Sequence, residues 1–69
     1  MVQGFGKRVR EFRLSRDMTQ QVFAASLGLS KQTVANVENG HRGFSLEVLE
    51  ALYRQGVDLN WLIAGAEKE

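Results

Sequence analysis

The sequence predicts a small all-α domain, and three observations support this fold class. Apolar residues recur at helical spacing along the whole chain, without the sustained apolar–polar alternation that would indicate strands. Glycines follow the apolar stretches at positions where helices commonly end, and the chain contains no proline. The length of 69 residues leaves room for one small domain.

The first helix is predicted over residues 5–16. Its apolar stripe consists of three residues at positions i, i+4 and i+7, namely Phe5, Val9 and Phe12. Met18 and Thr19 are expected to end this helix.

Two short helices joined by a tight turn are predicted next. Thr19 is a favourable N-cap for a helix that stops at Gly28, and Ser30 caps a third helix over residues 31–39. Their inner faces are apolar and comprise Phe23, Ala24, Leu27, Val34 and Val37. The connection allows about three residues between the helices, with glycine where a left-handed turn is needed. This arrangement describes a helix-turn-helix.

Two further helices complete the predicted domain. Ser45 caps a fourth helix that closes near Gly56, with an apolar stripe formed by Leu46, Leu49 and Leu52. Asp58 caps a final short helix over residues 59–64, which Gly65 ends. Residues 41–44 are expected to form a loop. The domain is expected to span residues 1–65, and residues 66–69 form a polar tail or the start of a linker.

The charge of the chain is unevenly distributed although its net charge is +1. Residues 1–16 carry +4, residues 17–44 are neutral, and residues 45–69 carry −3. This asymmetry is compatible with a polyanionic partner. The basic first helix also suggests a membrane-surface segment, but its apolar stripe is already needed for the core, which disfavours that alternative.

Short motifs at fixed offsets extend the match beyond the turn itself. They are Thr19-Gln20, Phe23-Ala24, Leu27-Gly28-Leu29-Ser30, Thr33-Val34 and Val37-Glu38-Asn39-Gly40. With these motifs the chain resembles the Cro/repressor-type (XRE-like) helix-turn-helix family of bacterial and phage regulators, including phage repressor N-terminal domains, over residues 5–65. The resemblance implies a compact five-helix, lambda-repressor-like fold. It also implies a sequence-specific, DNA-binding transcriptional regulator, and specifically a repressor.

The outward face of the third helix is the candidate for reading DNA bases. At about 100° per residue, Gln32, Asn36 and Asn39 lie opposite the apolar face. Amide side chains match the donor and acceptor of adenine in the major groove, and lysine matches the acceptors of guanine. The resemblance puts Lys31, Gln32 and Asn36 at base-reading positions, with Thr33 assisting. The alternative interpretation is a solvated helix face.

Candidate contacts to the DNA backbone surround this helix. The resemblance implies that Gln20 binds a phosphate and steadies the recognition helix, whereas the alternative is a cap-adjacent residue satisfied by water. Helix N-termini favour anions, and Thr19 and Ser30 lie at such positions. The remaining candidates are Asn39, His41 and Arg42, followed by the first-helix cations Lys7, Arg8 and Arg10. For the charged candidates, solvated surface charge is the alternative.

Arg13 and Glu38 invite a structural explanation. Each lies at the border of the apolar stripe of its helix, and the family pattern places them together. We therefore expect a partly buried ion pair between the first and third helices, in preference to a DNA contact by Arg13.

A domain of this size reads few base pairs, so useful specificity implies a homodimer on a near-palindromic operator in double-stranded DNA. The expected interface uses apolar residues in and before the last helix, namely Val57, Leu59, Trp61 and Ile63. The alternative function is an antitoxin or another protein-interaction module built on a helix-turn-helix scaffold. A stoichiometric small protein recovered by co-purification would favour that alternative.

Composition argues against several other classes of function. The chain has no cysteine and one histidine, so we expect no disulfide, no metal site and no cofactor. Its serines have no adjacent base apparent from the sequence, and we expect no enzymatic activity. No apolar run approaches the ~20 residues of a membrane span, and no signal-peptide region is recognisable. These features predict a cytoplasmic protein without membrane contact.

Overall fold

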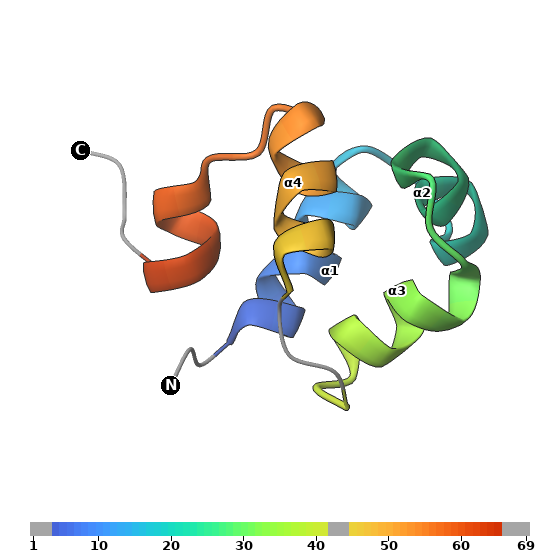
Figure 1. The fold of residues 1–69 in the computed structure, drawn as a ribbon, viewed down its shortest axis with the longest axis horizontal. Coiled ribbons are helices and arrows are strands. Elements are labelled where there is room, and N and C mark those ends of the chain that lie inside the picture. Colours follow the sequence, from blue (N-terminus) through green and yellow to red (C-terminus); the bar gives the residue numbers. More distant parts are fainter. Residues whose placement is uncertain (1–3, 42–44, 66–69) are drawn as a thin grey trace.

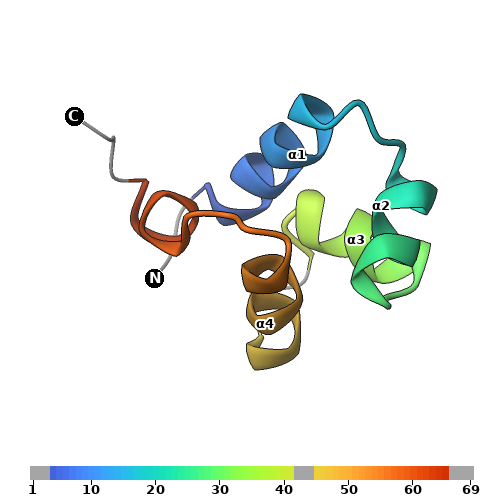
Figure 2. The ribbon, with the colours of Figure 1, turned by 90° about the horizontal axis from the view of Figure 1, so that it is seen from above.

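A computed structural model describes residues 4–41 and 45–65, and it confirms the all-α fold class for this part of the chain. The helices are α1 (Phe5–Ser15), α2 (Gln20–Leu27), α3 (Lys31–Glu38), α4 (Leu46–Arg54) and η1 (Asn60–Ala64). Figures 1 and 2 show the α2–α3 pair and η1 at opposite ends of the molecule, with α1 and α4 between them. Within the described ranges, no helix has the length and apolarity needed to cross a membrane.

The predicted serine and threonine caps are confirmed. The side-chain oxygens of Thr19, Ser30 and Ser45 each accept a hydrogen bond from the backbone N–H three residues later, at 3.1, 3.1 and 3.3 Å. These bonds satisfy N–H groups that the first turns of α2, α3 and α4 leave without a partner inside the helix.

The four α-helices end in the same pair of backbone hydrogen bonds, a Schellman turn. After α2, for example, the N–H of Gly28 bonds the carbonyl of Ala25 at 3.2 Å, and the N–H of Leu29 bonds that of Ala24 at 2.9 Å. Gly28 has the left-handed φ of +73° that this turn requires, and the turn returns Leu29 to the core. After α1 the corresponding residue is Asp17, with φ +57°. That turn ends α1 at Ser15, one residue short of the predicted boundary.

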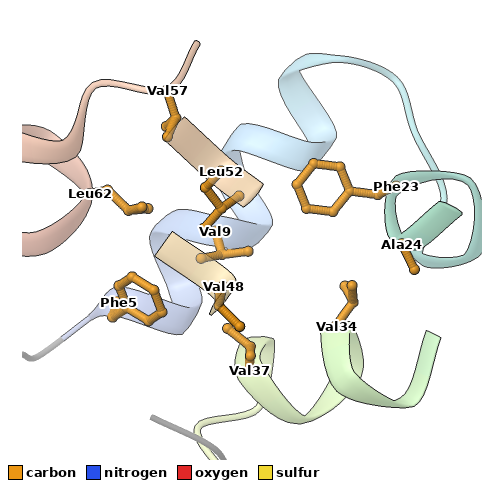
Figure 3. Close-up of a cluster of buried hydrophobic side chains, with 10 residues drawn as sticks. All are labelled: Phe5, Val9, Phe23, Ala24, Val34, Val37, Val48, Leu52, Val57 and Leu62. Carbon is orange, nitrogen blue, oxygen red and sulfur yellow. The ribbon is translucent and has the colours of Figure 1, made fainter. Parts of the chain in front are cut away.

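The core lies where α1, α3 and α4 meet, with contributions from α2 and η1 (Figure 3). Phe23, Leu52 and Leu62 are its most completely buried large side chains. The other buried members of the cluster are Phe5, Val9, Ala24, Val34, Val37, Val48 and Val57. Helix α3 packs against both α1 and α2, so the position of its outer face depends on two separate contacts.

The buried face of α4 includes Leu52 and part of Leu49, as predicted, but not Leu46. Leu46 is 81% exposed, and the buried residues are Val48, Ala51 and Leu52. The helix carries apolar residues on more than one side, so spacing alone does not select the side that faces the core. Leu46 is the first residue of α4 and projects beyond the packed region.

The last helix is shorter and wider than predicted. It comprises Asn60–Ala64 and has π-helical geometry, with Gly65 in the left-handed conformation after it. Its N-cap is Leu59 and not Asp58 as predicted, although Asp58 Oδ1 accepts a hydrogen bond from the N–H of Asn60 at 3.0 Å. Val57, predicted in the dimer interface, is instead buried in the core with 7% of its surface exposed. It directly follows the turn after α4, and this turn directs its side chain inward.

Gly6 permits close packing between α1 and α3. A Cβ atom at this position would collide with the backbone carbonyl oxygen of Val37 and lie 3.0 Å from that of Glu38. We expect Gly6→Ala to lower the free energy of unfolding by about 1–3 kcal/mol, because overpacking against backbone forces the helices apart. This cost exceeds the gain of up to about 1 kcal/mol in helix propensity.

A urea-denaturation curve of Gly6→Ala measures this effect, with Lys7→Ala as the control at the adjacent exposed position. Equal unfolding free energies for the two variants would contradict the close α1–α3 contact.

Candidate nucleic-acid interface

The outer face of α3 presents a pair of amide side chains. Gln32 is exposed and Asn36 is partly buried one turn later, and Gln32 Nε2 donates a hydrogen bond to Asn36 Oδ1 at 3.0 Å. This bond uses one of the two Gln32 Nε2 protons and leaves the other proton and the Oε1 acceptor of the same amide available. One amide that keeps a donor and an acceptor complements the N7 acceptor and N6 donor of adenine.

The remaining predicted base-reading residues lie at the start of α3. Lys31 is exposed and Thr33 is partly buried. Thr33 Oγ1 and Ser30 Oγ form a hydrogen bond at 2.9 Å, and Ser30 Oγ also accepts the N–H of Thr33. These two hydroxyls are therefore engaged in capping α3, and Lys31 is the flexible cation beside the amide pair.

One carboxylate joins α1, α2 and α3 behind this face. Glu38 accepts two hydrogen bonds from Arg13, from Nε at 2.7 Å and from a terminal nitrogen at 3.0 Å. Gln20 Nε2 also donates to Glu38, at 3.1 Å. The third guanidinium nitrogen of Arg13 donates to the carbonyl of Met18 at 2.8 Å. The side chains of Arg13 and Glu38 are only 9% and 2% exposed, so this ion pair is largely removed from water.

The charge of Arg13 is maintained despite its burial. Hydrogen bonding to Glu38 raises the pKa of Arg13 above its ordinary value, burial opposes this change, and Coulomb attraction to Glu38 adds to it. Arginine is protonated in proteins at ordinary pH even without such a partner. Loss of the Glu38 carboxylate would therefore leave an unpaired positive charge in a largely buried site.

Gln20 has a definite position in this network. It is partly buried at the first position of α2, and its amide nitrogen is held by Glu38 at the C-terminal end of α3. The bond leaves the second N–H of the amide available to another acceptor. Gln20 thus connects α2 to α3 and retains a donor.

The predicted DNA-backbone contacts outside the helix N-termini differ in exposure. Lys7 and Arg10 on α1 are exposed, and so are Asn39 and His41 after α3. Arg42 lies outside the described residues. Arg8, predicted as a candidate for DNA-backbone contact, instead donates hydrogen bonds to carbonyls of η1. Its guanidinium is directed along the molecule toward the last helix. Within residues 4–41 and 45–65 no cluster of His, Asp and Glu could hold a metal ion.

The predicted dimer surface is retained in part. Leu59, Trp61 and Ile63 are partly buried and lie in or beside η1, where Leu59 and Trp61 also pack against the core. Leu62 lies fully inside, and Val57 is excluded by its burial. Leu59, Trp61 and Ile63 lie in or beside η1, which is at the end of the molecule opposite the α2–α3 pair (Figure 1).

Three of the side-chain hydrogen bonds described above were not predicted from the sequence, and only one of them joins residues whose spacing along the chain could have indicated it. The Gln32–Asn36 bond joins residues four positions apart, a spacing at which helical side chains meet. The bonds from Gln20 to Glu38 and from Arg8 to η1 join residues 18 and 54–55 positions apart. Such pairs become neighbours only through the packing of whole helices.

A comparison with protein families matches residues 9–54 of the chain to the helix-turn-helix family. No solved structure matches the chain. The matched range contains α2, the turn, α3 and α4, together with most of α1.

Curated relatives carry regulatory names, not enzyme names. Control protein C.MunI from Mycoplasma sp is 34% identical, covering 94% of this chain and 90% of the relative. The cryptic phage CTXphi transcriptional repressor RstR from Vibrio cholerae is 31% identical, covering 91% of this chain and 58% of RstR. A propionyl-CoA carboxylase regulator from Cereibacter sphaeroides is 41% identical over 83% of this chain, which spans 13% of that protein.

Proposed function

The chain belongs to the helix-turn-helix family of DNA-binding transcriptional regulators, and from this premise we propose that it is a cytoplasmic repressor that reads a near-palindromic operator as a homodimer. The proposal rests on the pair of amide side chains, Gln32 and Asn36, on the outer face of α3, the helix that follows the tight α2–α3 turn. A helix placed in this way enters the major groove with its N-terminal residues at the base edges. Residues 1–65 form the DNA-binding domain.

Base recognition is assigned to the first two turns of α3. The exposed amide of Gln32 offers an acceptor and a donor that complement adenine, Asn36 holds this amide in place through its Oδ1, and Lys31 reaches the acceptors of a neighbouring guanine. Thr33 assists from the same face, where its methyl group can contact thymine. Operator sites are therefore expected to contain an A·T pair next to a G·C pair in each half-site.

Phosphate contacts are assigned mostly to neutral groups. The N-termini of α2 and α3, with Thr19, Ser30 and the second amide proton of Gln20, offer donors to an anion without formal charge. Asn39, His41 and Arg42 follow α3 and complete the set. This use of neutral groups explains how a chain of net charge +1 binds a polyanion.

The dimer contact is assigned to the patch formed by Leu59, Trp61 and Ile63. Joining two chains through this end leaves both α2–α3 pairs at the outer parts of the dimer (Figure 2). Two recognition helices about 34 Å apart then meet successive major grooves on one side of the DNA. Repression follows when such a dimer occupies a promoter. The name of RstR, a transcriptional repressor, supports this direction of regulation.

Salt dependence is a quantitative expectation of this proposal. If each protomer neutralises about three to four phosphates, the logarithm of the dimer's affinity falls against the logarithm of salt concentration with a slope of roughly −5 to −7. Fluorescence anisotropy on a labelled operator over a range of salt concentrations measures this slope.

Gln20→Ala is the variant to compare in this titration, because it removes a phosphate contact made by a neutral amide. We expect it to lower affinity at every salt concentration and to leave the slope unchanged, since no counterion is released at a neutral donor. An affinity that is independent of salt for the unaltered protein would contradict DNA binding through the phosphate backbone.

A further inference from the structure

Arg8 forms hydrogen bonds with residues 54 and 55 positions later in the chain. From α1, its Nε donates to the carbonyl of Leu62 at 2.8 Å, and a terminal nitrogen donates to the carbonyl of Ile63 at 3.2 Å. Both carbonyls lie in the last turn of η1, where the helix itself offers few hydrogen-bond partners. A cation at this end also meets the negative end of the helix dipole.

Two glycines make room for this guanidinium. A Cβ atom on Gly4 would lie 2.7 Å from a terminal nitrogen of Arg8, and a Cβ atom on Gly65 would lie 3.1 Å from the same atom. The guanidinium thus lies against the backbone immediately before α1 and immediately after η1. Side chains at either glycine would displace it, so the contact depends on two positions remaining without a Cβ.

Helix η1 has five residues, too few for a helix that is stable by itself, so its position depends on its attachments to the rest of the domain. Leu62 is its one fully buried side chain, and Trp61 is partly buried against the core. These side chains hold one side of η1 against the core but do not hold the backbone at its C-terminal end. The two hydrogen bonds of Arg8 supply the second point of attachment, on α1.

We propose that Arg8 is a positioning residue for the dimer surface: its guanidinium fixes the orientation of η1 on α1 and thereby the direction in which Trp61 and Ile63 face a second copy of the chain. The inference rests on the proposed homodimer for its effect on assembly. Its effect on η1 within one chain is independent of dimerisation.

The test uses Arg8→Met, which keeps a long apolar side chain and removes the charge and the donors. Arg10→Met is the matched control, because Arg10 is exposed on the same helix and loses the same charge. Trp61 is the single tryptophan of the chain and lies in η1, so its emission reports the packing of that helix. Emission is recorded at a protein concentration below the dissociation constant of the dimer, so that it reports on the monomer. Dimerisation is measured separately by sedimentation.

We expect Arg8→Met to shift Trp61 emission to longer wavelength and to weaken dimerisation by about tenfold or more, because two charge-assisted hydrogen bonds are lost. Arg10→Met should change neither quantity, and both variants should retain the far-UV circular dichroism of the unaltered protein. Should Arg8→Met unfold the domain, Gly4→Ala displaces the guanidinium without removing it and is expected to give the same emission shift.

The outcomes separate the two proposals. Unchanged emission and unchanged dimerisation in the Arg8 variant, or unchanged emission in Gly4→Ala where that variant is needed, would overturn the positioning role and leave the dimer intact. A protein that stays monomeric with and without operator DNA would overturn the dimer and the assembly role of Arg8. In that case a shift in Trp61 emission would still support the attachment of η1 by Arg8.

Discussion

Replacing Glu38 with alanine is expected to lower stability and DNA affinity together. The change removes the carboxylate that pairs with the guanidinium of Arg13, and only 8% of the surface of Arg13 is exposed. Gln20 also loses its hydrogen-bond partner. Removing one partner of a buried ion pair costs about 3–5 kcal/mol. A core of this size supplies no more than about 3–5 kcal/mol of net stability, so much of the variant should be unfolded.

A thermal melt measures this prediction, with an exposed ion pair as the control. Glu50 and Arg54 lie 3.5 Å apart on α4, with side chains 61% and 69% exposed. Glu50→Ala should change stability by no more than about 0.5 kcal/mol, as is usual for a surface pair within one helix. A melt of Glu38→Ala that coincides with that of Glu50→Ala would show that the buried pair does not support the fold.

The double variant Arg13→Leu with Glu38→Leu adds a second check. It removes both charges, so no unpaired charge remains in the interior, and such replacements are often neutral or stabilising. We expect it to be more stable than Glu38→Ala. Its DNA affinity should nevertheless stay low, because Gln20 is no longer held against α3.

Replacing both Gln32 and Asn36 with alanine is expected to abolish operator discrimination without unfolding the domain. Each well-made side-chain contact to a base contributes about 1–3 kcal/mol of discrimination, and the dimer repeats the pair in two half-sites. The two side chains bond to one another, and such a pair stabilises a helix by only about 0.2–0.5 kcal/mol. Stability should therefore change little.

Competition between operator and random DNA measures the discrimination of this variant. We expect operator affinity to fall to the level of random DNA, while random-DNA binding and the salt slope remain. Gln21→Ala is the control, because it removes an exposed amide from α2 and should leave the ratio of operator to random affinity unchanged. Retained discrimination in the double variant would place base recognition elsewhere in the molecule.

The sequence predicted local features of the fold well. Thr19, Ser30 and Ser45 precede apolar helical patterns, and each caps its helix as expected. Capping depends on residues three positions apart, and these are close in any helix that forms. In α4 the predicted stripe is correct at Leu49 and Leu52 and wrong at Leu46, because Leu46 and Val48 lie on different faces of a helix that carries apolar residues on both.

Features that depend on the packing of distant elements were less predictable. The burial of Val57 follows from the direction of the chain after α4, which its sequence does not specify. Arg8 could not be distinguished from Lys7 or Arg10 by charge, yet in the described structure its guanidinium donates hydrogen bonds to carbonyls of η1. The candidate base-reading residues came from a combination of helical spacing and family resemblance, and the structure adds the bond between two of them.

Selection of bound oligonucleotides from a random pool tests the central claim most directly. The claim is that α3 reads base edges and that two chains do so on one operator. We expect the unaltered protein to enrich a near-palindromic site with half-sites about 34 Å apart, and the Gln32→Ala, Asn36→Ala variant to enrich none. Failure of the unaltered protein to enrich any site, or recovery of the same site by the variant, would contradict the account.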